Sequence, residues 1–304
     1  MVTVDRRRFV AGLIGAGALF VRAPVSFAFV GARRIVALDW ASAETMFAIG
    51  VPPIAISSPY RGGQEELFGA AALSDTLQLG SMFEPNFEVL QSTRPDLIFY
   101  APWHAHLVPS LQRIAAVHLV NPRLPTDNML RNASICTIDV GKELAASSET
   151  NTYVDRCDEE LERLAERVRG LNARPALVGV LSPDGRHLSL YIKGSLLHDV
   201  LERLGLQNAY RGPASPSGNI TFGIERLADF PDADLYYLDT GPQSDAALRI
   251  LNDSTLWNAL NRTRRGTIKA IPYVWPFGAM ASAMAFARSV TAVMSTGGDV
   301  GNHG

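Results

Sequence analysis

The sequence predicts an α/β fold in which two lobes are joined by a single long, rigid helix. Two observations support this fold class. Short β-branched runs alternate with amphipathic segments from Arg33 onward, and the same alternation starts again at Ala176. Alternation of this kind is typical of α/β units. One long amphipathic stretch separates the two series, so we expect one lobe on each side of it.

The elements of each lobe follow from the alternation. The first series occupies residues 35–38, 43–49, 54–57, 97–100, 107–114 and 117–120, and the second occupies residues 176–181, 187–192, 196–204 and 234–238 before a final helix over 279–294. A chain of 304 residues is long enough to bury two separate cores.

The stretch between the two series predicts the long helix. Its apolar residues recur at spacings of three and four, and the positions between them are mostly charged: Val154, Cys157, Leu161, Leu164, Val168 and Leu171. One face is therefore apolar and the other solvated. Ser148 with Glu149 offers a cap, and Pro175 ends the pattern, so we expect a helix over residues 150–171. At roughly 1.5 Å per residue it is about 30 Å long and restricts hinge bending between the lobes.

The domain limits follow from these elements. We expect an N-terminal lobe over residues 33–147, the linking helix over 148–172, a C-terminal lobe over 174–296 and a flexible tail over 297–304. The tail carries too little apolar surface to order itself.

The first 28 residues resemble a twin-arginine export signal. Arg6-Arg7-Arg8 precedes an uncharged run from Phe9 to Val21, and small residues follow near Ala28. The run is too short to cross a bilayer core of about 30 Å, so a cleavable signal is favoured over a short membrane anchor or a buried helix. We therefore expect delivery to a periplasm.

Charge and cysteine content narrow the classes of function. The chain carries 28 basic and 30 acidic residues; removing residues 1–28, with four arginines and one aspartate, changes the net charge from −2 to −5. A mildly acidic chain with dispersed arginines has no electrostatic footprint for nucleic acid. The two cysteines, Cys136 and Cys157, are too few to stabilise two lobes through disulfides, and a buried free thiol is favoured over a disulfide.

A weak internal repeat links the two lobes. The segment from Glu84 to Tyr100 and the segment from Phe222 to Leu238 share one layout: a Glu near a helix start, an apolar residue two positions later, a Pro-Asp stop and a strand. The Glu of each copy is Glu88 or Glu225. Acidic residues also favour helix N-termini through the helix dipole alone, so the pattern by itself leaves both interpretations open.

Three segments together resemble a known family. Arg34-Ile-Val-Ala-Leu-Asp39-Trp40, the Gly80 to Asp96 segment with its Glu84-Pro-Asn86, and Val274-Trp275 with Gly278-Ala279 are similar to periplasmic ferric-hydroxamate siderophore-binding proteins. The resemblance covers essentially the whole chain after the signal. It implies a helical-backbone periplasmic binding protein: two α/β lobes, a shallow cleft between them, and delivery of the ligand to an inner-membrane permease of the ATP-binding-cassette (ABC) class.

The resemblance also implies roles for particular residues. One acidic residue of each lobe contacts the permease in that family, and Glu88 and Glu225 match those positions. Two separated carboxylates on one body favour orientation and on-rate more than affinity.

Positions of the expected cleft depart from the family pattern. Met82 stands where members usually have an arginine that hydrogen-bonds the iron-coordinating oxygens, His104 where they have a tyrosine, and Ser217 where they have an aromatic residue, whereas Trp275 is retained. The candidate ligand-binding residues are Tyr60, Arg61, Met82, Phe83, Trp103, His104, His106, Ser217, Trp275 and Phe277. Arg61 offers a replacement for the lost cation, and the two histidines of His104-Ala-His106 are expected to donate hydrogen bonds to ligand oxygens.

The expected ligand is a ferric siderophore, preferably of the hydroxamate type, with a carboxylate siderophore or haem as the runner-up. A siderophore wraps its iron in six oxygen ligands, so the protein needs no metal ligands or cofactor and reads the outside of a compact, partly apolar complex. A bare metal ion on His104 and His106 is disfavoured, because zinc sites use three or four ligands. Nucleophile elbows, Walker loops and zinc-protease motifs are missing from the sequence, so we expect a monomeric binding protein and no catalysis.

Overall fold

The computed structural model describes residues 33–58, 73, 75–123, 128–263 and 267–295. The expected signal over residues 1–28, the candidate ligand residues Tyr60 and Arg61, and the expected tail over 297–304 lie outside the described residues. None of the described helices is both long and apolar enough to cross a membrane.

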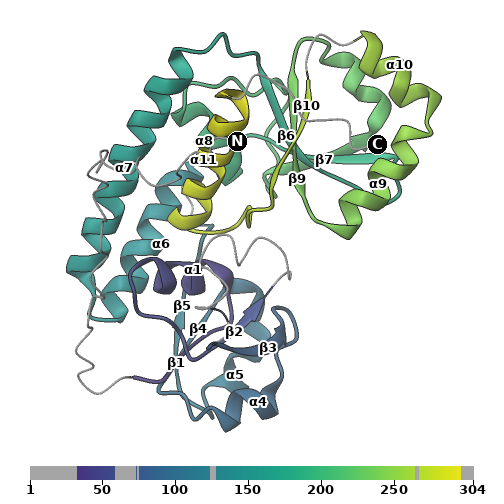
Figure 1. Cartoon of the computed structure of the whole chain (residues 1–304). Helices are drawn as coiled ribbons and strands as arrows, with labels where there is room; N and C mark the ends of the chain where they lie inside the picture. Colours follow the sequence, from purple (N-terminus) through teal and green to yellow (C-terminus); the bar gives the residue numbers. More distant parts are fainter. Residues whose placement is uncertain (1–32, 59–72, 74, 124–127, 264–266, 296–304) are drawn as a thin grey trace, which may run out of the picture. The chain divides into compact units, whose positions relative to one another are not determined.

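A sheet of five parallel strands forms the first half of the described chain, in the order β3-β2-β1-β4-β5 (Figure 1). Its elements are β1 (Ile35–Ala37), α1 (Trp40–Ala48), β2 (Ala55–Ser58), β3 (Leu77–Ser81), α4 (Phe87–Ser92), β4 (Leu97–Tyr100), the 3-10 helix η1 (Pro102–Leu107), α5 (Val108–Leu111) and β5 (Ala116–Leu119). Ile35 and Ala37 join one apolar cluster, whereas Val36 and Leu38 join another. Both faces of the central strands are therefore covered, as a parallel sheet requires.

A second, mixed sheet has the order β10-β9-β6-β7-β8. Strands β6, β9 and β10 are parallel, and β7 pairs antiparallel with both β6 and β8. Its elements are β6 (Ala176–Leu181), β7 (His187–Tyr191), α8 (Leu196–Arg203), β8 (Asn219–Gly223), the 3-10 helix η2 (Ile224–Asp229), β9 (Asp234–Asp239), α9 (Pro242–Asn252), α10 (Thr255–Thr263), β10 (Ile268–Pro272) and α11 (Met280–Ser295). The two α/β sheets with their helices confirm the expected fold class.

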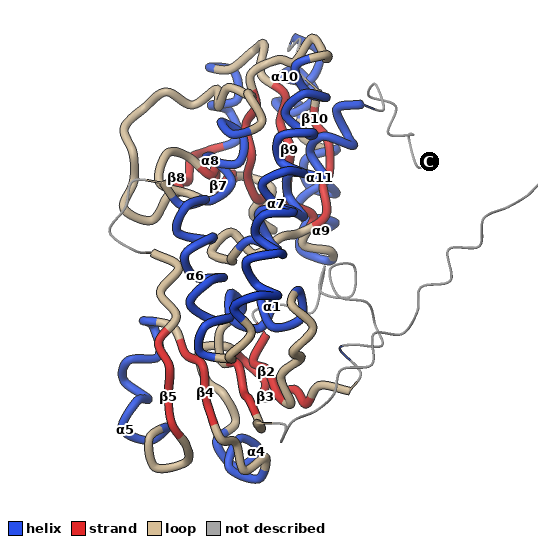
Figure 2. Tube along the Cα trace, turned by 90° about the vertical axis from the view of Figure 1, so that its left-hand side faces the viewer, coloured by secondary structure: helices blue, strands red, loops and turns tan. Residues whose placement is uncertain are grey.

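Two consecutive helices lie between the sheets in the sequence, α6 (Met129–Glu143) and α7 (Ser147–Arg169). They pack against each other, and α11 packs against both (Figures 1 and 2). The expected long helix is thus present as α7. The sequence analysis missed α6, because its apolar face is interrupted by the buried polar residues Asn132 and Thr137. The link between the sheets therefore runs through a helical pair.

The corner between α6 and α7 explains where α7 begins. Ala145 has a positive φ of 55°, and the Ala146 N–H donates to the Gly141 carbonyl, which closes α6. Helix α7 starts directly afterwards with Ala146 as its N-cap, so the expected cap by Ser148 is wrong. A Cβ at Gly141 would lie 1.9 Å from Thr150 Oγ1, so only glycine allows the two helices to approach this closely.

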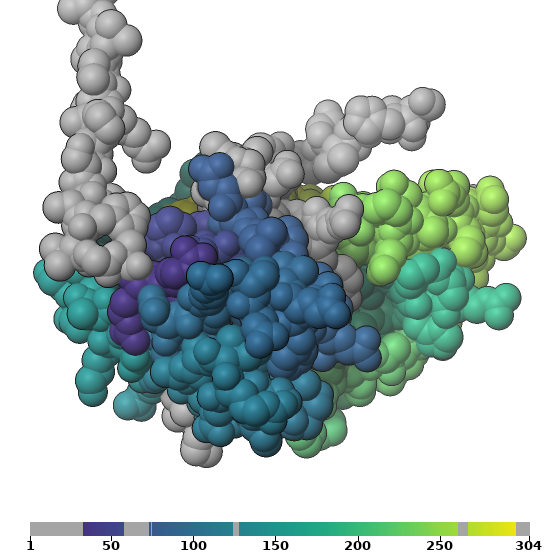
Figure 3. Space-filling view, turned by 90° about the horizontal axis from the view of Figure 1, so that it is seen from below, coloured from purple at the N-terminus to yellow at the C-terminus, as the bar shows by residue number. Residues whose placement is uncertain are grey.

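Most expected strands appear close to their predicted positions. Strands β4 and β6 match to the residue, and the last helix is shifted by one residue. Cys136 and Cys157 are both buried and free, as expected. In the view from below, atoms of the first half of the chain, in purple to blue, lie beside green atoms of its second half (Figure 3). No observation on the described residues tests the limits given above for the lobes, which stay predictions.

Candidate ligand-binding site

Candidate residues of the first sheet gather at one edge. Met82 follows β3, Trp103 and His104 follow β4, and Arg123 follows β5 by four residues. Because the strands are parallel, their carboxyl ends meet at the same edge, which is where ligands bind in open α/β sheets. The residues that follow β2, Tyr60 and Arg61 among them, lie outside the described part of the chain.

His104 is fully buried, and both of its ring nitrogens are engaged. The Ala101 N–H donates to Nδ1 over 3.1 Å, and Nε2 lies 2.6 Å from the Met82 carbonyl oxygen. Since Nδ1 accepts, the neutral ring carries its proton on Nε2 and donates it to that carbonyl. Burial lowers the pKa of His104 and keeps the ring neutral. His104 thus ties the turn after β4 to the turn after β3, and no ring nitrogen is left for a ligand.

The other residues of these two turns differ in exposure. The Met82 side chain is buried in the apolar cluster beneath α1, whereas Phe83 next to it is 59% exposed. Trp103 is partly buried against the same cluster, and His106 is exposed. Position 82 therefore contributes apolar packing and a carbonyl, and Phe83 is the residue that faces outward.

The loop between β10 and α11 brings two aromatic residues to the same cluster. Trp275 packs there with Met82, and Phe277 lies against it, partly buried. The two rings meet edge to face, with 5.5 Å between their centroids. Trp275 is only 9% exposed. The structure thus joins residues of both sheets in one aromatic group.

Arg123 connects Ser217 to this group, and the sequence analysis missed it. The Arg123 guanidinium donates to the carbonyl oxygens of Pro216 and of Ser217, the latter over 3.2 Å, and lies 5.4 Å from the centroid of the Phe277 ring. The Ser217 side chain is exposed and contacts Ser215. The sequence signal that could have found Arg123 is its place just after the last strand of the parallel sheet.

Two carboxyl groups are fully buried beside the aromatic group. Asp39 caps α1 by accepting from the Ser42 N–H over 2.9 Å and from its hydroxyl. Glu44 of α1 accepts from the Ala279 and Ser282 N–H groups and, over 2.5 Å, from the Ser282 hydroxyl. Burial raises the pKa of Asp39 to about 6 and that of Glu44 to about 7. Glu44 therefore caps the helix that follows the Trp275 loop.

The two acidic residues of the internal repeat are both exposed. Glu88 lies in the first turn of α4, whose N-cap Asn86 accepts from Val89, and Glu225 lies in the first turn of η2. Each element is followed by the expected Pro-Asp and strand. The layout of the repeat is therefore real at the level of secondary structure.

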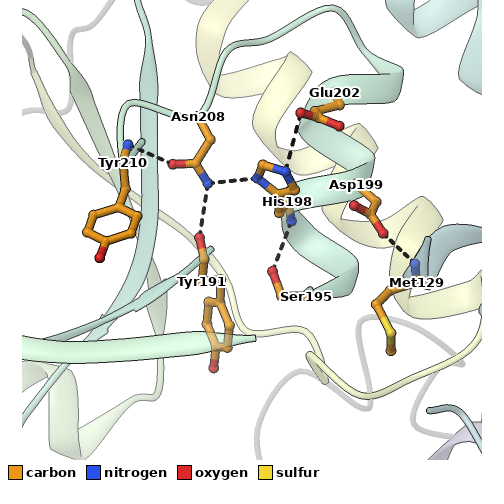
Figure 4. A network of polar contacts seen from close by, with 8 residues as sticks. All are labelled: Met129, Tyr191, Ser195, His198, Asp199, Glu202, Asn208 and Tyr210. Carbon is orange, nitrogen blue, oxygen red and sulfur yellow. Dashed lines mark hydrogen bonds and ion pairs between the residues drawn. The ribbon is translucent and has the colours of Figure 1, made fainter. Parts of the chain in front are cut away.

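One group of described residues has the geometry of a metal site, His198, Asp199 and Glu202 of α8, whose ligand atoms lie within 4.8 Å of one another (Figure 4). Asp199 already accepts from the Met129 N–H at the start of α6. His198 Nε2 lies 3.3 Å from a Glu202 carboxylate oxygen.

The protonation of His198 argues against a metal there. The Asn208 carbonyl oxygen accepts from the Tyr210 N–H over 3.0 Å, which fixes the orientation of the amide. The Asn208 amide group then donates to the Tyr191 carbonyl over 3.1 Å and to His198 Nδ1 over 3.2 Å (Figure 4). The proton of the neutral ring is therefore on Nε2, which donates to Glu202 and has no lone pair for a metal. The group is a structural network.

Comparisons with known proteins agree with this geometry. A family model described as "Periplasmic binding protein" matches residues 35–273. The iron(3+)-hydroxamate-binding protein FhuD of Escherichia coli (strain K12) is 27% identical over 94% of this chain and 95% of its own length. The Fe(3+)-citrate-binding protein YfmC of Bacillus subtilis (strain 168) is 23% identical over 78% of this chain and 72% of its own.

A solved structure shows the same fold. The siderophore-binding protein FhuD from Vibrio cholerae, bound to Fe3+–Desferal, superposes with a TM-score of 0.74 at 20% identity, covering 86% of this chain and 98% of that one. The two chains thus share a fold at low sequence identity.

Proposed function

We propose that this chain, which belongs to the periplasmic binding protein family, captures a ferric siderophore and delivers it to an inner-membrane permease of the ABC class. The observation that carries the proposal is the aromatic group that both sheets build. Trp103, Trp275 and Phe277 share one apolar cluster at the carboxyl edge of the first sheet, and Arg123 lies over the Phe277 ring as a cation. Aromatic faces with a few donors suit an iron complex that brings its own oxygen ligands.

The hydroxamate type is the preferred ligand. A ferric trihydroxamate is a compact complex of low net charge. One protein that this chain is similar to binds iron(3+)-hydroxamate by name, and another is a siderophore-binding protein with Fe3+–Desferal bound. His104 is neutral and Met82 is apolar, so these two positions add no positive charge. A highly anionic complex would need more cations than Arg123, the cation that the described residues place beside the aromatic group.

A carboxylate siderophore or haem is the second candidate. It is favoured by the departures at Met82, His104 and Ser217, and a relative of this chain binds ferric citrate by name. A bare metal ion is the least favoured ligand, because His104 and His198 both use their ring nitrogens within the protein.

Export and delivery belong to the same proposal. The twin-arginine pattern of residues 6–8 supports a periplasmic location. The exposed carboxylates of Glu88 and Glu225, one on each sheet's unit, support docking to a permease. A binding protein of this class performs no catalysis, and the family consists of binding proteins.

A tryptophan-fluorescence titration of the purified protein with ferrichrome tests the proposal. We expect saturable quenching at micromolar concentration or below, because Trp103 and Trp275 lie in the aromatic group. Trp275→Phe should remove a large share of the quenching. Trp257→Phe is the matched control, because Trp257 is equally buried but packs in a separate cluster of the second sheet.

Two outcomes contradict the proposal at different levels. Quenching by ferric citrate or haem without any response to ferrichrome would replace the hydroxamate by the second candidate. A protein shown to be folded by circular dichroism that responds to no iron complex would refute the function itself.

A further inference from the structure

The Arg123 guanidinium forms no ion pair with any carboxylate of the described residues. Its side chain is half-buried, and its acceptors are the two neutral carbonyl groups of Pro216 and Ser217. Several other described arginines pair with acids, as Arg288 does with Glu160. A half-buried cation held only by carbonyls and one aromatic face keeps its full charge available to a ligand.

The backbone around Arg123 holds it in this place. The Asn121 side-chain oxygen accepts from the Arg123 N–H over 3.0 Å. The Asn121 carbonyl in turn accepts from the thiol of Cys136 on α6, over 3.0 Å. The arginine therefore extends from a loop that is anchored to the helical layer, and these contacts hold its backbone independently of the loop that carries Ser217.

Arg123 also lies beside the positions where a ligand is expected. Its guanidinium covers the Phe277 ring, Phe277 contacts Trp275, and Trp275 packs with Met82. Met82 contributes no charged group, since its side chain is an uncharged thioether, and that side chain is buried. The site thus lacks a cation at position 82 but has one at Arg123, on the loop that follows β5.

We propose that Arg123 is the cation that binds the ligand in this site. When the chelate binds, the guanidinium gives up its hydrogen bonds to the Pro216 and Ser217 carbonyls and donates instead to the iron-coordinating oxygens. The proposal rests on the proposed function. The exchange is favourable because hydrogen bonds to anionic oxygens are roughly twice as strong as those to neutral carbonyls. The planar fork that now serves two successive carbonyls fits two adjacent oxygens of an iron complex equally well.

Two forms of one chelate test this proposal. Ferrioxamine B carries a protonated terminal amine and a net charge of about +1, and its N-acetyl derivative is neutral with the same iron coordination. For Arg123→Met we expect the affinity for both forms to fall by about 10- to 100-fold, the loss of hydrogen bonds to charged acceptors. The wild type should bind the neutral form more tightly than the cationic form, because a cation near the ligand disfavours a second cation. In Arg123→Met we expect the ratio of these two affinities to fall by roughly two- to four-fold.

Two further variants serve as controls. Arg123→Lys keeps the charge and loses the fork, so it should keep the preference for the neutral form while its affinity for both forms remains reduced. Arg226→Met is the matched control, since Arg226 also lies over an aromatic ring, that of Phe222, with 5.2 Å between its Cζ and the ring centroid, but pairs with Asp229 outside the site. It should bind both forms like the wild type.

Each remaining outcome decides the question. If Arg123→Met lowers affinity for both forms and leaves their ratio unchanged, Arg123 only holds the Ser217 loop and the proposal is wrong. An affinity within two-fold of the wild type also overturns it. If the wild type binds neither form, the proposed function and the role of Arg123 are both wrong. If the wild type binds normally and the variants behave as in the two outcomes above, only the role of Arg123 is wrong.

Discussion

Replacing Glu44 by glutamine should change how the stability of the protein depends on pH. Glu44 is fully buried in α1 and accepts hydrogen bonds from Ala279 and Ser282 at the start of α11. In Glu44→Gln the amide oxygen can still accept from the two N–H groups, and the amide nitrogen can donate to the Ser282 hydroxyl. The shape and the cap are therefore kept, and only the titratable proton is lost.

The magnitude follows from the pKa of Glu44, which burial raises from 4.5 to about 7. A folded-state pKa above the unfolded value contributes stability that is fully present below the unfolded pKa and is lost as the pH rises through the folded pKa. Between pH 5 and pH 8 the wild type should therefore lose about 2.5 kcal/mol of unfolding free energy relative to Glu44→Gln. At pH 8 the glutamine variant is expected to be the more stable protein.

Chemical denaturation of both proteins at four pH values from 5 to 8 measures this difference. The pKa of Asp39 is also raised by burial, so the comparison is repeated in an Asp39→Asn background, where the same slope should remain. Glu160→Gln is a second control, because a hydrogen bond from Arg288 lowers the pKa of Glu160; its difference from the wild type should stay level over this range. The reasoning would be refuted if the difference in unfolding free energy between Glu44→Gln and the wild type did not change with pH. It would also be refuted if the wild type were the more stable protein at high pH.

Two other predictions concern the permease contact and the turn after β4. Changing both Glu88 and Glu225 to alanine should leave ligand affinity intact and abolish stimulation of transport in reconstituted vesicles; weaker ligand binding would instead place them in the site. His104→Phe should cost roughly 2–4 kcal/mol of unfolding free energy in chemical denaturation, because it leaves the buried Met82 carbonyl without the 2.6 Å hydrogen bond that His104 provides. A loss below about 1 kcal/mol would show that the ring acts by volume alone.

The fold class could be predicted because it rests on periodicity. Strands β4 and β6 are short apolar runs in the sequence. The charged residues between the regularly spaced apolar positions of α7 indicated an amphipathic helix. Helix α6 could not be found this way, since Asn132 and Thr137 face inward and are held by tertiary contacts such as the one from the Met280 N–H to Thr137.

The positions of several candidate residues could be predicted, whereas their contacts could not; their role in ligand binding stays a prediction. The turns after the parallel strands were identified from their aromatic residues, and Trp103, Trp275 and Phe277 do belong to or pack against one apolar cluster. The engagement of both nitrogens of His104 depends on two backbone groups that only the folded turns bring together. The contact of Arg123 with Ser217 spans 94 residues, and no local pattern encodes a hydrogen bond of that separation.

Two buried carboxyl groups show how the two sheets are held relative to each other. Glu44 belongs to the unit of the first sheet and caps α11, which follows the second sheet. Asp199 belongs to the unit of the second sheet and accepts from Met129 at the start of α6, which follows the first sheet. Each unit thus caps a helix that follows the other unit's sheet, and removal of either acid would leave buried N–H groups without an acceptor.

This reciprocal capping bears on how the site opens. A hinge between the sheets would break buried hydrogen bonds at two places, in addition to the packing of α11 on α6 and α7. The contacts of Arg123 with Pro216 and Ser217 are exposed, involve neutral carbonyls, and can be exchanged at little cost. We therefore expect a ligand to enter through rearrangement of the loop that carries Pro216 and Ser217, while the helical layer keeps the two sheets in place.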